Sequence, residues 1–346
     1  MRVTRVKCFL CMCIFFIGTL FVFQNRVYAA DSQNKQKSNA SSQNHSKTSA
    51  KSHKKVVKKP KSVRTTVTRT SQPAVAGRPS FATALGLSGM RDELNLKSSV
   101  AMVVNQDTKE VYFEKNPSVT LPIASITKIM TAMVILDSNL SLDEPIVINS
   151  EDAKSYHKSR LAQGTHLTRG EALLLALMSS ENRAAYTLGR NYPGGIPAFI
   201  YAMNQKAAEI GMKNSHFADP TGLLSENVAS AEDLTRMLSA AYQYDQIREF
   251  STRPELTMMI GNHPQKFLNT NRLVRTGDMD IGLQKTGFIN AAGRCLVMQA
   301  RVNDTPLLLV FLDSVGTQSR FADAVRVSDW YKRAPANEHQ AIRSLM

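Results

Sequence analysis

The sequence predicts an α+β fold, with a mostly antiparallel sheet of about five strands beside a helical lobe. Two strand-like runs lie near residue 100 and three near the end of the chain, and helical patterns of apolar residues fill the interval. Two- and three-stranded pieces are only marginally stable alone, so we expect the distant strands to form one sheet. A binding site is then expected in the cleft between sheet and lobe.

The first two strands are expected at 99–104 (SVAMVV) and 110–115 (EVYFEK), joined by the turn sequence NQDTK as a hairpin. The later strands are expected at 281–289, 294–302 and 307–313, because each is an apolar run bounded by turn residues such as Asn, Asp, Gly and Pro. These five segments account for the predicted sheet.

Apolar residues recur with helical spacing at 125–137, 169–178, 183–190, 197–210, 231–243 and 319–331. In the first of these helices their spacing predicts one buried stripe, made of Ile126, Ile129, Met130, Met133 and Val134. The first five helices form the predicted lobe, and the last one follows the final strand.

The N-terminus has the pattern of a secretory signal peptide, expected over residues 1–29. Three basic residues precede sixteen uncharged, mostly apolar ones, and small residues at Val27 and Ala29 suit signal peptidase. The alternative is an uncleaved membrane anchor. This alternative is disfavoured because the apolar stretch is shorter than the ~20 residues of a usual membrane span. We therefore expect export across the inner membrane to the periplasm, with association to membrane or wall left open.

Residues 30–91 are rich in Ser, Lys, Gln, Asn and Thr, and we expect a disordered basic tether because they bury little apolar surface. The folded domain is expected over 92–335 and a short tail over 336–346. Residues 1–90 hold 16 Lys and Arg against one acid, whereas the rest of the chain holds 27 of each, so the net charge of +15 lies outside the folded domain. An anionic wall or membrane surface is the expected partner of the tether, with a merely solvated spacer as the alternative.

Nucleic acid is not an expected partner, since a secreted chain meets little of it. No metal or other cofactor is expected, because the seven histidines show none of the spacings typical of metal ligands. Three of the four cysteines lie in the signal peptide, and the fourth, Cys295, lies in the apolar run CLVM. We expect Cys295 to be a small buried hydrophobe and not a nucleophile.

The spacing Ser-x-x-Lys occurs four times, at Ser32, Ser52, Ser125 and Ser155, and context separates one occurrence from the others. Ser125 opens an apolar helical stripe, so its hydroxyl is expected at the helix N-terminus, where unpaired N–H groups favour developing negative charge. Lys128 lies three residues on and shares its face. Because an ammonium is no base until its pKa falls, the pair needs burial or a second cation.

Lys285-Thr286-Gly287, within the strand pattern GLQKTGF, supplies that second cation. The lysine and the threonine hydroxyl suit a substrate carboxylate, and the glycine allows close approach of a substrate backbone. The similar Arg-Thr-Gly at Arg275 is followed by Asp-Met-Asp and not by an apolar strand, so Lys285 is preferred.

A third polar element is Ser180-Glu181-Asn182, which lies in a break between two helical patterns. A hydroxyl and an amide at this break are expected to project into the cleft. The spacing Ser-x-Asn also occurs at positions 32, 42 and 225, and Ser180 as a helix N-cap is the alternative interpretation.

Together, the three motifs resemble those of class A β-lactamases and penicillin-binding proteins. Over residues 92–335 the chain resembles the low-molecular-mass penicillin-binding proteins, which are serine D-Ala-D-Ala peptidases of the S11 type. The matching stretches are PIASITKIMTA, SSENRAA, DPTGL with Asn227 and the following AEDL, and KTGFINAAGRCLVM. The last stretch is most similar to the endopeptidase branch, the penicillin-binding protein 7 type. The resemblance implies a β-lactamase/DD-peptidase-like fold and a β-lactam-sensitive hydrolase acting on peptidoglycan peptides.

Carried over to this sequence, the resemblance implies an acyl-ester nucleophile at Ser125 and its base at Lys128. Ser180 would relay a proton to the leaving amine, and Asn182 would hold the substrate amide. Glu181 occupies the position at which the family pattern has Asp. This difference leaves the Ser180 hydroxyl and the Asn182 amide unchanged.

The same resemblance implies that Lys285 and Thr286 bind the substrate carboxylate beside Gly287. The oxyanion hole would be formed by the backbone N–H groups of Ser125 and Phe288.

Cleavage of D-Ala-diaminopimelate cross-links is the preferred activity, because the chain resembles the endopeptidase branch and ends soon after its last helix, without the second β-domain and amphipathic anchor that the longer carboxypeptidases of the family carry. Trimming of D-Ala-D-Ala pentapeptides is the alternative, since both substrates place a carboxylate beside the scissile bond. A β-lactamase is disfavoured because neither Glu209 nor Glu226 has an Asn four positions on. A non-catalytic wall-binding protein is disfavoured because all three motifs are intact.

Overall fold

The computed structural model describes residues 79–155 and 159–333. The expected signal peptide (1–29), the tether up to residue 78 and the C-terminal tail (336–346) lie outside the described residues, so these expectations stay predictions. Within the described ranges, no helix combines the length and the apolar character that crossing a membrane requires.

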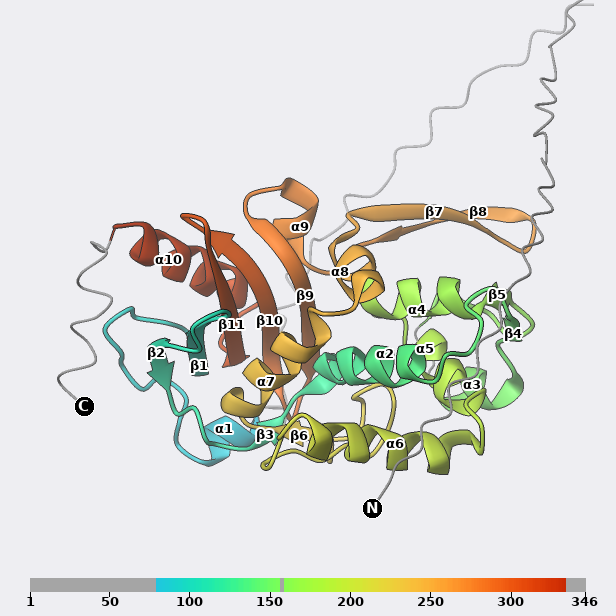
Figure 1. The fold of residues 1–346 in the computed structure, drawn as a ribbon, viewed down its shortest axis with the longest axis horizontal. Helices are drawn as coiled ribbons and strands as arrows, with labels where there is room; N and C mark the ends of the chain where they lie inside the picture. The colour runs from blue at the N-terminus through green and yellow to red at the C-terminus, as the bar shows by residue number, and fades with distance from the viewer. Residues whose placement is uncertain (1–78, 156–158, 334–346) are drawn as a thin grey trace, which may run out of the picture. The chain divides into compact units, whose positions relative to one another are not determined.

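One antiparallel sheet joins the two ends of the described chain (Figure 1). Its strand order is β2-β1-β11-β10-β9, and the strands are β1 (Ser98–Asn105), β2 (Val111–Lys115), β9 (Asp280–Ile289), β10 (Gly293–Val302) and β11 (Thr305–Ser314). The pairing of β1 with β11, in which Ala101 lies opposite Phe311, connects segments more than 200 residues apart. The predicted five-stranded sheet built from distant segments is therefore confirmed.

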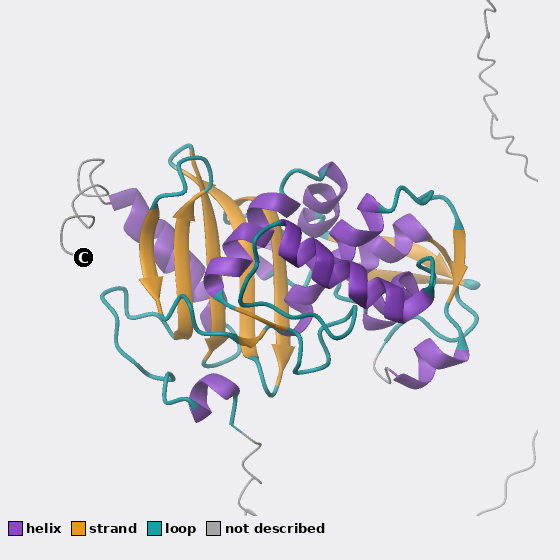
Figure 2. Ribbon diagram, turned by 60° about the horizontal axis from the view of Figure 1, so that its bottom comes forward, coloured by secondary structure: helices purple, strands orange, loops and turns teal. Residues whose placement is uncertain are grey.

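The sheet is covered on both faces, which explains why its strands are apolar without alternation. In β11, Leu309 and Phe311 pack against α10 (Ser319–Arg333), whereas Leu308 and Val310 face the helical lobe. Burying each such side chain contributes about 1.5–3 kcal/mol. The result is a layered domain in which the edge strand β9 lies next to the lobe (Figure 2).

The helical lobe follows the predicted pattern within a few residues at each end. Its helices are α2 (Thr127–Asp137), α3 (Ser150–Ser155), α4 (Arg169–Met178), α5 (Asn182–Arg190), α6 (Gly195–Glu209), α7 (Ala231–Ala241) and α8 (Asp245–Thr252). Helix α4 begins where it does because Thr168 and Glu171 form a reciprocal capping box. The prediction missed only the short helices α3 and α8 of this lobe.

The prediction of one buried stripe on α2 was wrong, because residues 127–135 of the helix are buried on every side. Its polar face finds partners inside the lobe: Thr127 Oγ1 donates to the Ala124 carbonyl at 2.8 Å, and Thr131 Oγ1 donates to the Pro220 carbonyl at 2.7 Å. Satisfied hydroxyls cost little to bury. The helix therefore forms the centre of the lobe, and its N-terminus faces the sheet.

The sequence reasoning also missed a hairpin and several short elements. They are α1 (Phe81–Ala84), β3 (Leu121–Pro122), β4 (Pro145–Val147), β5 (His166–Thr168), β6 (Val228–Ala229), β7 (Glu255–Ile260), β8 (His263–Leu268) and α9 (Arg272–Thr276). The hairpin β7-β8 had a signal, since Leu256, Met258 and Ile260 alternate along the strand and pack on the core.

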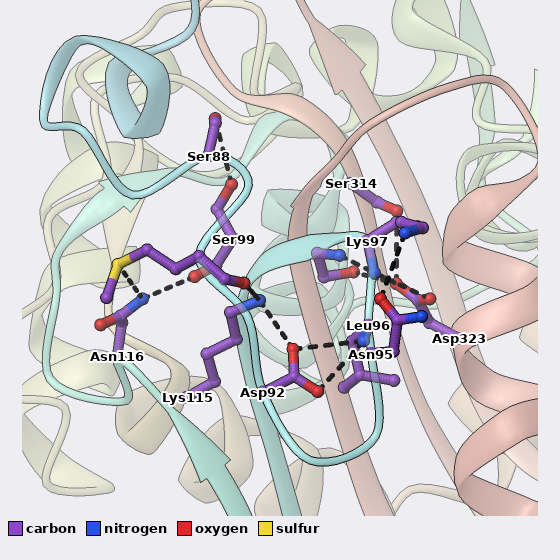
Figure 3. A network of polar contacts seen from close by, with 12 residues as sticks. Ser88, Asp92, Asn95, Leu96, Lys97, Ser99, Lys115, Asn116, Ser314 and Asp323 are labelled. Atoms are coloured by element: carbon purple, nitrogen blue, oxygen red, sulfur yellow. Dashed lines mark hydrogen bonds and ion pairs between the residues drawn. The ribbon is translucent and has the colours of Figure 1, made fainter.

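The folded chain begins earlier than the expected boundary at residue 92. Residues 80–97 lie against the sheet, and the Phe81 N–H donates to the Ala291 carbonyl at 3.0 Å. Figure 3 shows Asp92 accepting from the Leu96 N–H and pairing with Lys115 at 2.8 Å. These polar contacts hold residues that the sequence analysis assigned to the end of the tether.

Candidate active site

Ser125 lies at a sharp turn where the chain passes from β3 into α2. The expected helix at 125 begins as a 3₁₀ turn, η1 (Ala124–Ile126), and becomes α-helical at Thr127. Ala124 has φ +49°, a conformation that is uncommon outside glycine and that marks strained turns at functional sites. The turn places Ser125 at the end of the helix that carries the unpaired N–H groups, as predicted.

Two glycines allow neighbouring segments to approach this turn. A Cβ on Gly222, which has φ +80°, would overlap the Ala124 carbonyl. A Cβ on Gly287 of β9 would lie 2.9 Å from the Ile123 carbonyl oxygen and 3.2 Å from the Ser125 nitrogen. The sequence argument placed Gly287 beside a substrate, and the structure shows that it also lets β9 close on the serine turn.

We expect Gly222→Ala to destabilise the domain by about 3 kcal/mol or more, because the added methyl must displace the backbone of the serine turn. Gly261→Ala is the matched control, since Gly261 also has positive φ but nothing lies within 4 Å of its Cβ position. The control should lose about 1 kcal/mol. Thermal and urea unfolding measure both, and equal losses would contradict the steric explanation.

Lys128 is fully buried beside Ser125. Its Nζ lies 2.9 Å from Ser125 Oγ, 2.8 Å from Asn182 Oδ1 and 2.7 Å from the Thr221 carbonyl oxygen. Burial lowers the pKa of Lys128 to about 7, although Asp219 and Glu181 oppose this effect. An amine with that pKa is partly neutral at pH 7 and can accept the hydroxyl proton of Ser125.

The loop containing Thr221 also holds Lys128. Asp219 accepts from the Thr221 hydroxyl and from the Gly222 N–H, and Asn227 donates to the Asp219 carboxylate. In the sequence these residues were noted only as part of a resembling stretch, DPTGL with Asn227. Their role in positioning the lysine was not predicted, because it depends on a backbone carbonyl.

Ser180 and Lys285 form a second polar pair. Lys285 Nζ lies 2.9 Å from Ser180 Oγ and 3.0 Å from the Thr286 carbonyl oxygen. Burial, with the charges of Lys128 and Arg320, lowers the pKa of Lys285 well below its usual value. Ser180 has φ +60° and precedes Glu181, the N-cap residue of α5, so the alternative in which Ser180 caps the helix was wrong.

The structure brings together polar side chains singled out in the sequence, namely Ser125, Lys128, Ser180, Asn182 and Lys285, whereas Thr286 contacts Lys285 through its carbonyl oxygen. Phe288 follows on β9, half exposed. The competing Arg-Thr-Gly ends α9, with Gly277 as its left-handed C-cap. Cys295 is buried and its pKa is raised to about 12, as expected of an inert thiol. In the described ranges, no three His, Cys, Asp or Glu side chains gather as a metal site requires.

The family model Peptidase S11, described as D-alanyl-D-alanine carboxypeptidase, matches residues 88–316. The chain belongs to this family of serine D-Ala-D-Ala peptidases. It is similar to the D-alanyl-D-alanine endopeptidase of Pseudomonas aeruginosa, with 47% identity over 72% of this chain and 84% of that protein. The enzyme of the same name from Escherichia coli K12 is 45% identical over 68% of this chain and 77% of that protein.

Solved structures agree with the S11 assignment. The Streptomyces K15 DD-transpeptidase is similar to this chain with a TM-score of 0.64 and 25% identity, covering 68% of this chain and 97% of the transpeptidase. The predicted DD-peptidase-like fold is therefore confirmed.

Arg320 of α10 is a charged neighbour of Lys285 that the sequence reasoning did not single out. It is 8% exposed, and its Nε has no hydrogen-bond partner among the described residues. Burial, then the charge of Arg294, lowers the pKa of Arg320 to about 10. The charge of Arg320 contributes, after burial and Lys128, to the low pKa of Lys285. No motif marks Arg320, because it lies 35 residues after Lys285 in a helix on the other face of the sheet.

Proposed function

We propose that this S11 peptidase hydrolyses D-Ala-diaminopimelate cross-links of peptidoglycan through an acyl-enzyme on Ser125. The observation that carries the proposal is the contact between Ser125 Oγ and the buried, partly neutral Lys128 Nζ, at 2.9 Å. A serine with an adjacent base of this pKa is suited to nucleophilic attack on a carbonyl near neutral pH.

In the acylation step, Ser125 Oγ attacks the carbonyl carbon of D-Ala, and its proton moves to Lys128 Nζ. The backbone N–H groups of Ser125 and Phe288 would hold the oxyanion. Ser180, bonded to Lys285, would give its proton to the leaving amine as the amide bond breaks and would take in return the proton held by Lys128, which becomes neutral again. In deacylation, Lys128 would accept a proton from the attacking water and give it to Ser125 Oγ as the ester bond breaks and the D-Ala carboxylate leaves.

The basic groups at and around Lys285 support a substrate that carries a carboxylate beside the scissile bond. The pKa of Lys285 is lowered by burial and by two neighbouring cations. A bound carboxylate would pair with Lys285 and Arg320, favour their charged forms and accept from the Thr286 hydroxyl. The α-carboxylate of diaminopimelate in a cross-link meets this requirement.

The relatives favour endopeptidase over carboxypeptidase activity. The two similar proteins at 47% and 45% identity bear the name endopeptidase, whereas a D-alanyl-D-alanine carboxypeptidase of Bacillus subtilis is 30% identical. Carboxypeptidase activity is the second candidate, because a terminal D-Ala also presents its carboxylate to Lys285.

Purified muropeptide dimers test the choice directly. We expect the protein to convert D-Ala-diaminopimelate dimers to monomers, and Ser125→Ala to leave them intact. Release of D-alanine from pentapeptide monomers with dimers untouched would overturn the choice in favour of carboxypeptidase. A penicilloyl adduct that turned over within seconds would instead indicate a β-lactamase.

We also propose a periplasmic location, supported by the signal-like residues 1–29 and by the similarity to proteins named D-alanyl-D-alanine endopeptidase. Fractionation of cells that express the full chain tests this location, and recovery in the cytoplasm would contradict it. Binding of the basic tether to an anionic surface stays a prediction.

A further inference from the structure

Glu181 is a buried carboxylate in the middle of the Ser-Glu-Asn motif, with 5% of its surface exposed. Two side chains hold it: Arg160 Nε donates to Glu181 Oε1 at 2.8 Å, and Ser159 Oγ donates to Glu181 Oε2 at 2.7 Å. Buried carboxylates are costly unless they are paired and hydrogen-bonded. Because both of its oxygens have partners, Glu181 is built into the site and does not point to solvent.

Arg160 connects this carboxylate to the hairpin β7-β8. Its guanidinium lies 4.4 Å from the centroid of the Phe267 ring, and its Nη1 donates to the Lys266 carbonyl at 3.3 Å. Three residues beyond Phe267, Thr270 Oγ1 lies 2.7 Å from the hydroxyl of Thr286. The same arginine therefore braces the Ser-Glu-Asn turn and the segment that contacts Thr286 on β9.

Glu181 also affects the reacting lysine. Its neighbour in the chain, Asn182, contacts Lys128 directly, and the Glu181 charge opposes the fall of the Lys128 pKa that burial causes. The other charged groups that face Lys128 are Asp219, which acts in the same direction, and Lys285, which repels it.

We propose that Glu181 and Arg160 form a positioning pair. The pair holds Ser180 and Asn182 in place beside Lys128 and Lys285, and the charge of Arg160 determines how much of the negative charge of Glu181 acts on Lys128. This inference rests on the proposed Ser125 and Lys128 chemistry and adds two residues that do not touch the substrate. Arg160 and Glu181 lie 21 residues apart in the sequence, and no sequence motif predicts their contact.

The two partners should shift the pH dependence of acylation in opposite directions. Glu181→Gln removes a negative charge near Lys128, so the rise of the acylation rate with pH should move to lower pH by about half a unit. Arg160→Met removes the cation that balances Glu181, so the rise should move to higher pH by a similar amount, roughly half a unit. A loss of structure alone would lower the rate without shifts of opposite sign.

Acylation by a fluorescent penicillin, measured from pH 5 to 9 on the full chain, tests the pair. Arg160→Lys keeps the charge and should shift the profile less than Arg160→Met. Glu181→Asp keeps the charge but shortens the reach to Arg160, so it should lower the maximal rate with little shift. Thermal unfolding of each variant confirms that it is folded.

Arg326→Met is the matched control, because Arg326 is also 37% exposed and pairs with a buried carboxylate, Asp323, on α10. It should leave the acylation profile unchanged. Shifts of Glu181→Gln and Arg160→Met in the same direction, or no shift in either, would overturn the pair while leaving the peptidase proposal intact. Labelling that persists in Ser125→Ala would instead overturn the peptidase proposal itself.

Discussion

Lys128→Met is expected to slow acylation of Ser125 by about 10³–10⁴-fold, because it removes the base and leaves a side chain of similar size. The acylation rate of the unmodified protein should rise about tenfold between pH 6 and 8, since the pKa of Lys128 is about 7 and only its neutral form accepts a proton. The variant should lack this rise. Stopped-flow labelling with a fluorescent penicillin measures both quantities.

Lys115→Met provides the matched control for this variant. Lys115 is also buried, at 8% exposure, and it pairs with Asp92 at 2.8 Å away from the cleft. Losing it should lower the unfolding temperature but leave the acylation rate per folded molecule unchanged. If both variants lost activity equally, removal of any buried lysine would explain the loss, and the assignment of Lys128 as the base would be wrong.

Lys285→Met is expected to lower kcat/KM for substrates with a free carboxylate by about 10²–10³-fold, because it removes the amine that is proposed to pair with that carboxylate. The informative comparison uses two D-Ala-D-Ala peptides that differ only in a terminal carboxylate or carboxamide. The unmodified protein should prefer the carboxylate strongly, and the variant should barely distinguish the two peptides.

This comparison separates recognition from proton relay, since Lys285 Nζ also contacts Ser180 Oγ. A defect in proton relay slows hydrolysis of both peptides by the same factor, whereas a defect in recognition slows hydrolysis of the carboxylate peptide alone. A variant that kept the full preference for the carboxylate would contradict the proposed role of Lys285 and leave Arg320 as the remaining cation.

The sheet was predictable because its strands are long apolar runs, such as 294–302, that no helical spacing explains. The burial of α2 on every side was not predictable. Its polar residues Thr127 and Thr131 lie outside the predicted apolar stripe, and their partner carbonyls, from Ala124 and Pro220, come from the fold. Periodicity reports which residues are apolar, and tertiary hydrogen bonds decide which polar residues are buried.

The site divides in the same way. Ser125, Lys128, Ser180 and Lys285 carry recognisable spacings and local contexts, so the sequence was enough to select them. The supporting contacts depend on single residues from distant segments, as with Arg160 on Glu181, and on a main-chain oxygen in the case of Thr221. Neither kind of contact leaves a pattern in one sequence, and only the fold brings the groups together.

The identity of the acylated residue tests the account most directly. The full chain is treated with benzylpenicillin, digested and mapped by mass spectrometry, with Ser125→Ala treated in parallel. We predict one stable penicilloyl adduct, on the peptide that contains Ser125, and none in the variant. An adduct on Ser180, or equal modification of both proteins, would contradict the assignment of Ser125 as the nucleophile.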